Sequence, residues 1–277
     1  PPSADPDPAH DDAPRPAPFS RGPRPLPSPA ALAKLEAATP AAFQEGSMAQ
    51  DGRQFVRYTF FKVDPAWRRL GAGERQEQKR EFAAVADEFA SRLALRSYST
   101  VGTRGDCDFM LWAISPTLEL LHEFAAALNR TRLAAWLTTP YAYLAMTRRS
   151  PYVGRHRHEG QEGTSQTLHP LGRRYCFVYP FVKTHAWYQL PVEERQRMME
   201  EHFKVGHRFP TVKINTTYSF GLDDQEFVVG FETDSAADFL ELVMALREAE
   251  ARPYTERDTP IFTCVLTPLA ACLDALG

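Results

Sequence analysis

The chain contains two copies of one sequence unit, and this duplication limits its possible folds more than any other feature. The phrase TFFKVDPAWRRL (59–70) returns as YPFVKTHAWYQL (179–190), about 120 residues later. The match continues with ERQ at 74–76 and 194–196, and with YSTVGTRGDCDFMLWAISP (98–116) and YSFGLDDQEFVVGFETDS (218–235). A similarity that keeps nearly one offset through several elements indicates an internal duplication, so we expect two similar folded units.

Each copy is predicted to fold as strand, helix, strand, strand and helix. Aromatic and β-branched residues fill the expected first strands at 54–63 and 174–183. The other expected elements are first helices at 74–93 and 191–206, hairpins at 98–114 and 212–232, and last helices capped by Ser115 and Ser235. Helices on one face of an antiparallel sheet make an α+β unit, and the other face of each sheet then needs a partner.

The last helix of the second copy has one apolar face. Its residues Phe239, Leu242, Val243 and Leu246 repeat at helical spacing. This pattern predicts packing in the core rather than contact with a cofactor.

Two segments lie outside the duplicated units. Residues 1–52 are rich in Pro, Ala, Asp and Arg and have few large apolar side chains. Such a segment cannot bury enough surface to offset its ordering entropy, so we expect a disordered tail. The stretch GRHRHEGQEGTSQTLHPLG (154–172) is predicted to be a linker between an N-terminal unit at 53–153 and a C-terminal unit at 173–277.

Composition narrows the classes of partner. The formal net charge of -3 argues against nucleic acid and anionic membranes as partners. The sequence has no apolar run of about 18 residues, so no membrane insertion is expected, and no signal peptide is readable. The four cysteines have no metal-ligand spacing, which favours reduced thiols in a cytoplasmic protein.

The second copy gains three residues that carry chemistry. At the offset of 120, Phe82, Thr59 and Val63 are replaced by His202, Tyr179 and Lys183. Histidine is the commonest metal ligand, and His202 has no HExxH motif or Cys/His cluster beside it. A lone histidine is what haem iron needs, because the porphyrin supplies four nitrogens. The alternative is that His202 is an ordinary core residue on an apolar helix face.

Three phrases carry a resemblance to a known family. They are YPFVKTHAWYQLPVEERQRMMEEH, VKINTTYSFGLDDQEFVVGFETD and LREAEARPYTERDTPIFT. In order and spacing they resemble the chlorite dismutase family of haem proteins, which includes the coproheme decarboxylases. The resemblance covers roughly residues 53–277 and implies tandem ferredoxin-like units, a dimeric α+β barrel with antiparallel sheets, in a homopentamer. It implies that the C-terminal unit binds haem b or coproheme.

The resemblance also assigns roles around the iron. His202 falls on the family's proximal ligand, and Glu250 falls near the carboxylate that hydrogen-bonds this histidine in chlorite-degrading members. Ile214 falls on the distal position, where chlorite dismutases have arginine. Isoleucine cannot donate a hydrogen bond, which argues against chlorite chemistry. The alternative for Glu250 is a solvated helical glutamate.

Tyr179 falls on the tyrosine that decarboxylases use as a radical. In that chemistry hydrogen peroxide reacts with ferric coproheme, and the oxidising equivalent moves to the tyrosine. The tyrosine then takes hydrogen from a propionate, CO2 leaves and a vinyl group remains. Lys183 would face the same propionates as a fixed charge. The alternatives are a structural tyrosine and a plain surface lysine.

Further residues of the resemblance complete the expected pocket. Trp187 and Arg247 are assigned to cofactor binding, with Arg247 on a propionate. His207 stands where one decarboxylase branch has arginine. His158, in the linker, is the candidate base for peroxide deprotonation. The alternative is that the linker histidines are solvated and take no part in chemistry.

The favoured function is therefore peroxide-dependent decarboxylation of two coproheme propionates to give haem b. Two other functions stay open. One is a chlorite dismutase-like or peroxidase-type haem enzyme, and the other is a haem-binding protein without turnover.

Overall fold

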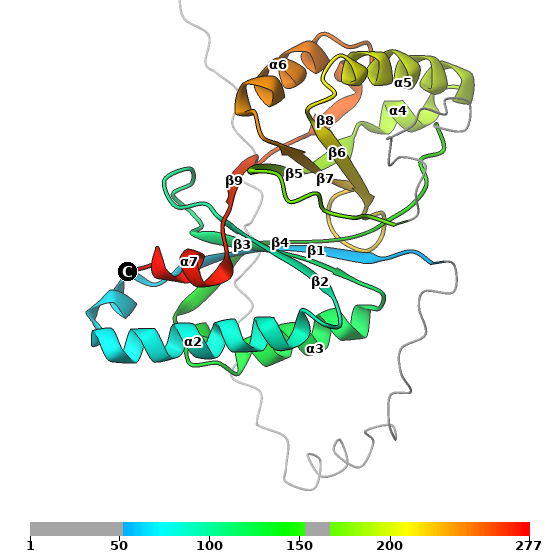
Figure 1. Ribbon diagram of the computed structural model, residues 1–277. Coiled ribbons are helices and arrows are strands. Elements are labelled where there is room, and N and C mark those ends of the chain that lie inside the picture. Colours follow the sequence, from blue (N-terminus) through cyan, green and yellow to red (C-terminus); the bar gives the residue numbers. More distant parts are fainter. Residues whose placement is uncertain (1–51, 153–166) are drawn as a thin grey trace, which may run out of the picture. The chain divides into compact units, whose positions relative to one another are not determined.

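The computed structural model describes residues 52–152 and 167–277. The expected tail, apart from Gly52, and His158 lie outside this part. The first half contains β1 (Phe55–Val63), η1 (Pro65–Arg69), α2 (Ala72–Phe89), β2 (Ala94–Ser99), β3 (Phe109–Ser115), α3 (Leu118–Asn129), η2 (Leu133–Trp136) and β4 (Leu137–Met146). The second half contains β5 (Tyr175–Lys183), α4 (His185–Gln189), α5 (Val192–His207), β6 (Lys213–Tyr218), β7 (Phe227–Thr233), α6 (Ala236–Arg247), η5 (Arg252–Tyr254), β8 (Thr255–Arg257), β9 (Phe262–Leu266) and α7 (Leu269–Asp274) (Figure 1).

The duplicated sequence folds as duplicated structure. Strands β1 and β5 have the same length and lie 120 residues apart, as do η1 and α4. The offset is 119 at β2 and β6, and it falls to 118 at β3 and β7 because the first hairpin loop is one residue longer. Ser235 caps α6, as expected, but Thr117 caps α3 instead of Ser115. The expectation for Ser115 was wrong because it carried the offset of 120 past this longer loop.

The strands form one ring. The order is β7-β6-β4-β1-β3-β2-β9-β5, and β5 pairs again with β7. Each half supplies four neighbouring strands with the ferredoxin-like order, and β8 adds to the end of β5. The halves meet where β4 pairs with β6 and where β2 pairs with β9. This arrangement confirms the expected α+β barrel of tandem units.

The inside of the ring is filled by side chains of both halves. They include Tyr58, Tyr98 and Trp112 of the first half and Val178 and Phe262 of the second, all at most 1% exposed. Tyr58 and Trp112 stack with ring centroids 5.2 Å apart. The sheet face that was expected to need a partner therefore finds it within the chain.

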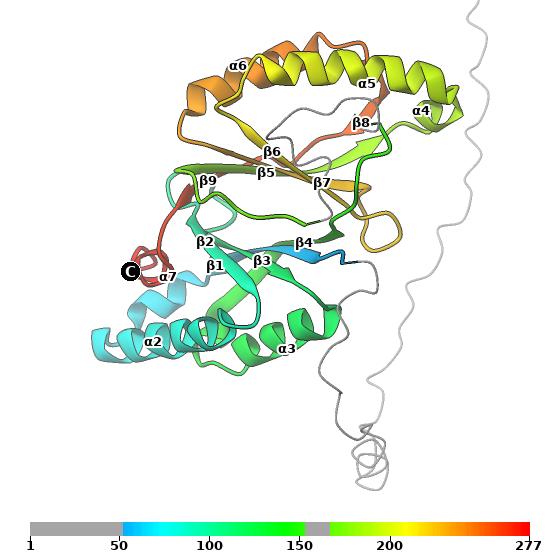
Figure 2. The same cartoon turned by 45° about the vertical axis from the view of Figure 1, so that its right-hand side comes forward.

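The helices cover the outer faces of the ring. In the first half α2 and α3 pack on the sheet, and α7 joins them although it comes from the end of the chain (Figures 1 and 2). In the second half α5 and α6 lie over β5, β6 and β7. Phe239 and Leu242 of α6 are buried against this sheet, as their spacing predicted.

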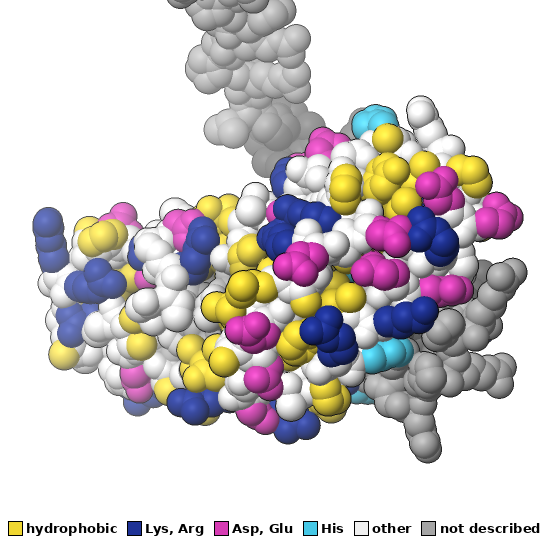
Figure 3. All heavy atoms as spheres, turned by 90° about the horizontal axis from the view of Figure 1, so that it is seen from above, with side chains coloured by type: hydrophobic (Ala, Val, Ile, Leu, Met, Phe, Trp, Pro, Cys, Tyr) yellow, Lys and Arg dark blue, Asp and Glu magenta, His cyan; other side chains and the backbone are white. Residues whose placement is uncertain are grey.

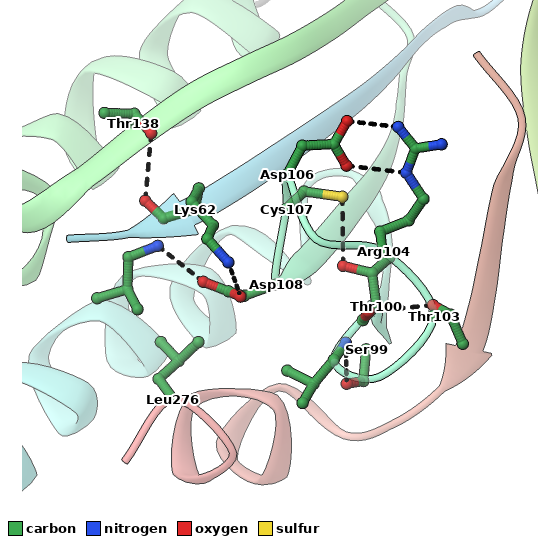
Figure 4. Close-up of polar contacts among 12 residues, drawn as sticks. Lys62, Ser99, Thr100, Thr103, Arg104, Asp106, Cys107, Asp108, Thr138 and Leu276 are labelled. Atoms are coloured by element: carbon green, nitrogen blue, oxygen red, sulfur yellow. Dashed lines mark hydrogen bonds and ion pairs between the residues drawn. The ribbon is translucent and has the colours of Figure 1, made fainter. Parts of the chain in front are cut away.

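The loop between β2 and β3 fastens the first half to the chain around β9. Thr103 Oγ1 donates to Thr263 O at 2.6 Å, and Arg104 Nη1 donates to Ile261 O at 3.2 Å. Figure 4 shows Arg104 held by the carboxylate of Asp106. The same charge-assisted hydrogen bonds lower the pKa of Asp106 to about 2. The two halves are therefore joined by polar contacts as well as by strand pairing.

The end of the predicted linker is anchored in the fold. Leu168 is 5% exposed, and its N–H donates to Gln54 Oε1 at 2.6 Å. The N–H groups of Leu171 and Gly172 donate to the buried carboxylate of Glu232 at 3.1 and 2.8 Å. These residues therefore have fixed positions beside the second half. Among residues 52–152 and 167–277, no helix is long and apolar enough to cross a membrane.

Candidate functional site

A cavity of about 1090 Å³ opens in the second half of the chain. Its walls come from β5, α4, α5, β6, β7 and α6, with contributions from residues 147–152 after β4 and from the anchored end of the linker. Six of the sequence-predicted residues line it: Tyr179, Lys183, Trp187, His202, Ile214 and Arg247. His207 lines it too, whereas Glu250 does not. The structure therefore brings together most of the described residues that the sequence singled out.

In the first half, the position that corresponds to this cavity is filled by a packed aromatic core. Phe82 of α2 is fully buried, and its ring meets Phe61 and Phe109 edge to face with centroids 6.0 Å apart. The corresponding helix position in the second half is His202, and Ala86 of α2 corresponds to Gly206 of α5. Smaller or polar side chains on α5 thus accompany an open cavity where the first half has a packed core.

His202 has the properties of a possible metal ligand. It lies on the cavity face of α5, and its ring nitrogens have no hydrogen-bond partner among the described residues. Burial, with a further contribution from Lys183, lowers the pKa of His202 to about 4, so the imidazole is neutral near pH 7. No group of three His, Cys, Asp or Glu residues in the described part could hold a bare metal ion. One neutral imidazole facing a large cavity fits an iron porphyrin, which brings its own nitrogens.

Glu250 is not placed as the resemblance implied. Helix α6 ends at Arg247, and Glu250 follows in a turn at the surface. Its carboxylate accepts from Arg197 Nη1 at 2.5 Å, and both side chains are about half exposed. The face of the molecule over α4–α6 carries charges of both signs with apolar side chains between them (Figure 3). The structure thus shows Glu250 in a surface ion pair, which is near the solvated alternative but lies in a turn and not in a helix.

Tyr179 lies on the wall of the cavity with a free hydroxyl. The residue is 9% exposed, and its ring stacks on Phe231 with centroids 5.6 Å apart. Its hydroxyl makes no hydrogen bond with the described residues. Burial raises the pKa of Tyr179 above its ordinary value, and Asp258 adds to this effect while Arg247 and Arg252 oppose it. Tyr179 therefore stays protonated and lies within the field of a charged cluster.

That cluster ties two arginines to one carboxylate. Arg252 Nη1 donates to Asp258 Oδ2 at 2.7 Å, and Arg247 Nη1 donates to the same oxygen. All three residues line the cavity. Burial opposes ionisation of Asp258, but the two guanidinium groups outweigh it and hold the pKa of the carboxyl below its ordinary value. Two arginines against one aspartate leave this wall with a net positive charge.

Lys183, four residues after Tyr179 on strand β5, adds a third cation to the cavity wall. Its ammonium lies 4.3 Å from the ring centroid of Trp187 and donates to Ala251 O at 3.2 Å. Burial, with a smaller effect of Arg252, lowers the pKa of Lys183 to about 8, while Glu226 acts in the opposite direction. The lysine is therefore mostly charged near pH 7 and faces the cavity, not bulk solvent.

Ile214 and His207 complete the predicted set. Ile214 of β6 presents its side chain to the cavity, and its Cδ1 comes within 3.7 Å of where a Cβ on Gly206 would stand. His207, the last residue of α5, is exposed and also lines the cavity. The wall at Ile214 is thus apolar, without a hydrogen-bond donor from that side chain.

The sequence reasoning missed several cavity residues. Arg252 and Asp258 lie in the phrase ARPYTERDTP, which was recognised without assigning either residue a role. Tyr188 donates to Glu226 Oε2 at 2.6 Å, and that carboxylate also accepts from the Lys183 N–H at 2.8 Å. The last group of missed residues is Arg148, Arg195, Val243 and Leu246, which line the cavity as well. Val243 and Leu246 pack against the core of the second half, as their helical spacing predicted, and they also line the cavity.

Comparison with known proteins agrees with this geometry. The sequence model of the chlorite dismutase family matches residues 75–267. The chain is 30% identical over 218 residues to a coproheme decarboxylase from Mycolicibacterium smegmatis. The aligned region covers 75% of this chain and 89% of that protein. The structure of chlorite dismutase from Candidatus Nitrospira defluvii in complex with imidazole gives a TM-score of 0.73 at 26% identity, covering 80% of this chain and 94% of that one.

A mutant of the same chlorite dismutase gives the same TM-score of 0.73 at 26% identity, covering 80% of this chain and 95% of that chain. The family match thus spans well over half of the chain, from α2 of the first half to the strand β9 that closes the ring. The chain belongs to the chlorite dismutase family.

Proposed function

We propose that this protein is a coproheme decarboxylase, which uses hydrogen peroxide to convert two propionates of coproheme to vinyl groups. One observation carries the proposal: Tyr179, with its hydroxyl free, lines the same cavity as a single neutral histidine and a group of cations. The similarity to the Mycolicibacterium smegmatis coproheme decarboxylase supports it.

The cavity residues would hold the iron porphyrin by three kinds of contact. His202 would ligate the iron through its neutral imidazole nitrogen. Lys183, Arg247 and Arg252 would bind propionate carboxylates through charge-assisted hydrogen bonds. The apolar side chains of the walls, with Ile214 among them, would enclose the ring and exclude water. When bound, the iron porphyrin supplies the redox chemistry with peroxide.

Tyr179 would carry the reactive step. Once oxidised to its phenoxyl radical, it takes a hydrogen atom from the β-carbon of a propionate held at the cationic wall. Loss of one more electron from the propionate releases CO2 and leaves a vinyl group. Each round consumes one hydrogen peroxide and one proton and forms two waters, so two rounds give haem b. The cations act by holding the propionate in position for Tyr179, and such positioning accounts for much of the rate advantage of a bound substrate.

Chlorite dismutation is the second candidate, because the similar solved structures are chlorite dismutases. The apolar Ile214 counts against it, since an oxyanion beside the iron needs a hydrogen-bond donor and this side chain has none. Binding without turnover is the third candidate.

One experiment separates the three functions. The full chain is mixed with ferric coproheme and titrated with hydrogen peroxide. The mass of the porphyrin is measured at each step. Stepwise loss of two carboxyl groups, ending at haem b, is the expected result. Tight binding with only bleaching of the porphyrin would contradict decarboxylation. Oxygen release from chlorite by the haem b complex would then identify a dismutase, and the absence of both reactions would leave a binding protein.

A further inference from the structure

The duplication provides an internal comparison for an arginine that is identical in both halves. Arg75 of α2 corresponds to Arg195 of α5. In the first half Arg75 Nη1 donates to Arg68 O at 2.7 Å and to Leu70 O at 2.9 Å, so the guanidinium closes the turn before its own helix. The Arg195 side chain makes no hydrogen bond or ion pair with any described residue, and its Nε is unpaired. The same side chain has thus lost its structural role in the second half.

The position of Arg195 makes this lack of partners costly. Its Nε is buried and unpaired, and the residue lines the cavity. Arg75 Nε is unpaired too, but the Nη1 of Arg75 has acceptors in the chain and that residue does not line the cavity. A donor that is shielded from water without a compensating partner is unfavourable, because it has lost its hydration. An anionic group of a bound molecule would supply the missing acceptors.

The helix fixes where that anionic group would be. Arg195 and His202 are seven residues apart on α5, which puts them on one face about 10 Å apart along the helix axis. Met199 and Gly206 continue the same cavity-facing row. A ligand whose centre is held by His202 would therefore have its periphery, not its centre, beside Arg195.

Arg195 belongs to a different part of the wall from the cations near Tyr179. The charges that act on Tyr179 are Asp258, Arg247 and Arg252, and Arg195 is not among them. Arg195 acts instead on Tyr188, which also lines the cavity. Arg195 is thus a second cationic site of the cavity apart from the pair of Arg247 and Arg252, in addition to Lys183 and Arg148.

We infer that Arg195 is a carboxylate-binding residue that holds a peripheral carboxylate of the porphyrin on an edge not served by Arg247 and Arg252. This inference rests on the proposed function, because it takes the ligand to be a porphyrin. Coproheme carries four carboxylates and haem b carries two. A second cationic site therefore favours a tetracarboxylate over a dicarboxylate and makes Arg195 a determinant of substrate specificity.

Binding of metal-free coproporphyrin tests the inference without iron, peroxide or turnover. The full chain is titrated into the fluorescent porphyrin, and the dissociation constant is compared for Arg195→Gln, Arg195→Met and the control Arg197→Gln. Arg197 is on the same helix but exposed and paired with Glu250. We expect the two Arg195 variants to weaken binding about tenfold and the control to leave it unchanged. Having two uncharged variants guards against one that does not fold, as judged by circular dichroism.

The same titration with protoporphyrin IX, which has two carboxylates, measures the specificity for four carboxylates over two. The preference for coproporphyrin over protoporphyrin should fall in both Arg195 variants and persist in Arg197→Gln. Folded Arg195 variants that bind coproporphyrin as tightly as the unmodified protein would overturn the inference. If those variants weaken binding but peroxide yields no haem b in the unmodified protein, the carboxylate site stands and the proposed function fails. If haem b forms and the Arg195 variants bind normally, only this inference fails.

Discussion

His202 on α5 and Phe82 on α2 occupy the same position of the duplicated unit, and only Phe82 is packed inside an aromatic core. Phe82 is fully buried, whereas His202 faces a cavity of about 1090 Å³. At this position the first half has a packed aromatic ring, and the second half has a neutral imidazole nitrogen that can bind a metal. The first half therefore shows the packed state from which the site departs.

The first prediction concerns this nitrogen. His202→Ala should remove histidine ligation of a bound iron porphyrin, because no other described cavity residue has a neutral imidazole enclosed in this way. The measurement is the electronic absorption and electron paramagnetic resonance of the ferric complex. Added imidazole should restore a nitrogen-ligated spectrum. His122→Ala, on the exposed side of α3, is the control. An unchanged spectrum in His202→Ala would exclude this residue as the ligand.

The second prediction concerns the proposed radical. Tyr179→Phe should bind coproheme as tightly as the unmodified protein but form no haem b with peroxide, because it removes only the hydroxyl group that a phenoxyl radical requires. The hydroxyl makes no hydrogen bond with the described residues, so stability should change by less than about 0.5 kcal/mol. Tyr175→Phe is the matched control, since Tyr175 lies on the same strand without lining the cavity. Haem b formation by Tyr179→Phe, followed by mass, would sink the assignment.

The fold could be predicted to a large extent because the duplication let each half serve as a check on the other. The expected first strands at 54–63 and 174–183 differ from β1 and β5 by one residue at their starts. Strands β4 and β9 were missed. In the chain β4 follows α3 and β9 follows α6 and β8. Each pairs with the first strand of its own half and with a strand of the other half, and no local pattern reveals these pairings.

Comparison of the two copies pointed to the site only where they differ. His202, Tyr179 and Lys183 stood out as substitutions, and all three line the cavity. Arg195 was invisible to this comparison because the first copy has the same residue, Arg75, and only its hydrogen bonds differ. The role of Glu250 rested on the resemblance alone, and in the structure α6 ends at Arg247, before this residue. The end of a helix depends on tertiary contacts more than on composition.

The third prediction uses the pKa of Lys183. As pH rises through about 8, Lys183 should lose its charge, and affinity for metal-free coproporphyrin should fall several-fold between pH 7 and 9.5. A bound carboxylate favours the charged form, so the fall should centre somewhat above pH 8. Lys183→Gln should remove this step, and Lys204→Gln, exposed on α5, should keep it. Arg252 and Glu226 are the charges that act on Lys183.

The stability of the ligand-free protein should change with pH in the opposite direction to its porphyrin affinity, and through the same group, Lys183. The pKa of Lys183 is lowered in the folded chain, so the unfolded chain binds more protons between about pH 8 and 10.5. The ligand-free protein should therefore gain stability from this residue as pH rises across that window, while it loses affinity for carboxylates. Parallel changes of binding and stability in the unmodified protein, both absent from Lys183→Gln, would contradict the assignment.

The fourth prediction concerns Gly206, where the first half has Ala86. A glycine inside a helix costs about 0.5–1 kcal/mol relative to alanine. A Cβ here would meet only Ile214 Cδ1 at 3.7 Å, an ordinary contact. Gly206→Ala should therefore stabilise the ligand-free protein by up to about 1 kcal/mol in urea unfolding. Gly206→Leu should fill part of the cavity and weaken porphyrin binding. A destabilised Gly206→Ala variant would mean that this backbone position is under other constraints.

The last prediction tests how the two halves fit inside the ring. A Cβ on Gly230 of β7 would lie 2.9 Å from Tyr58 Oη, and Tyr58 is fully buried against Trp112. Gly230→Ala should therefore destabilise the protein by about 1–3 kcal/mol, the usual cost of overpacking. Tyr58→Phe removes a buried hydroxyl that has no hydrogen-bond partner in the described structure, so alone it should be neutral or stabilising.

The double variant decides whether this contact is the cause. Tyr58→Phe should remove most of the cost of Gly230→Ala, because the atom that clashes is gone, and urea unfolding of all four proteins gives the coupling energy. We expect a coupling of at least about 1 kcal/mol. If the two changes add to within about 0.5 kcal/mol, the halves do not meet through this pair, and the loss in Gly230→Ala must come from the strand backbone of β7. The fit between halves would then depend on strand pairing rather than on side chains inside the ring.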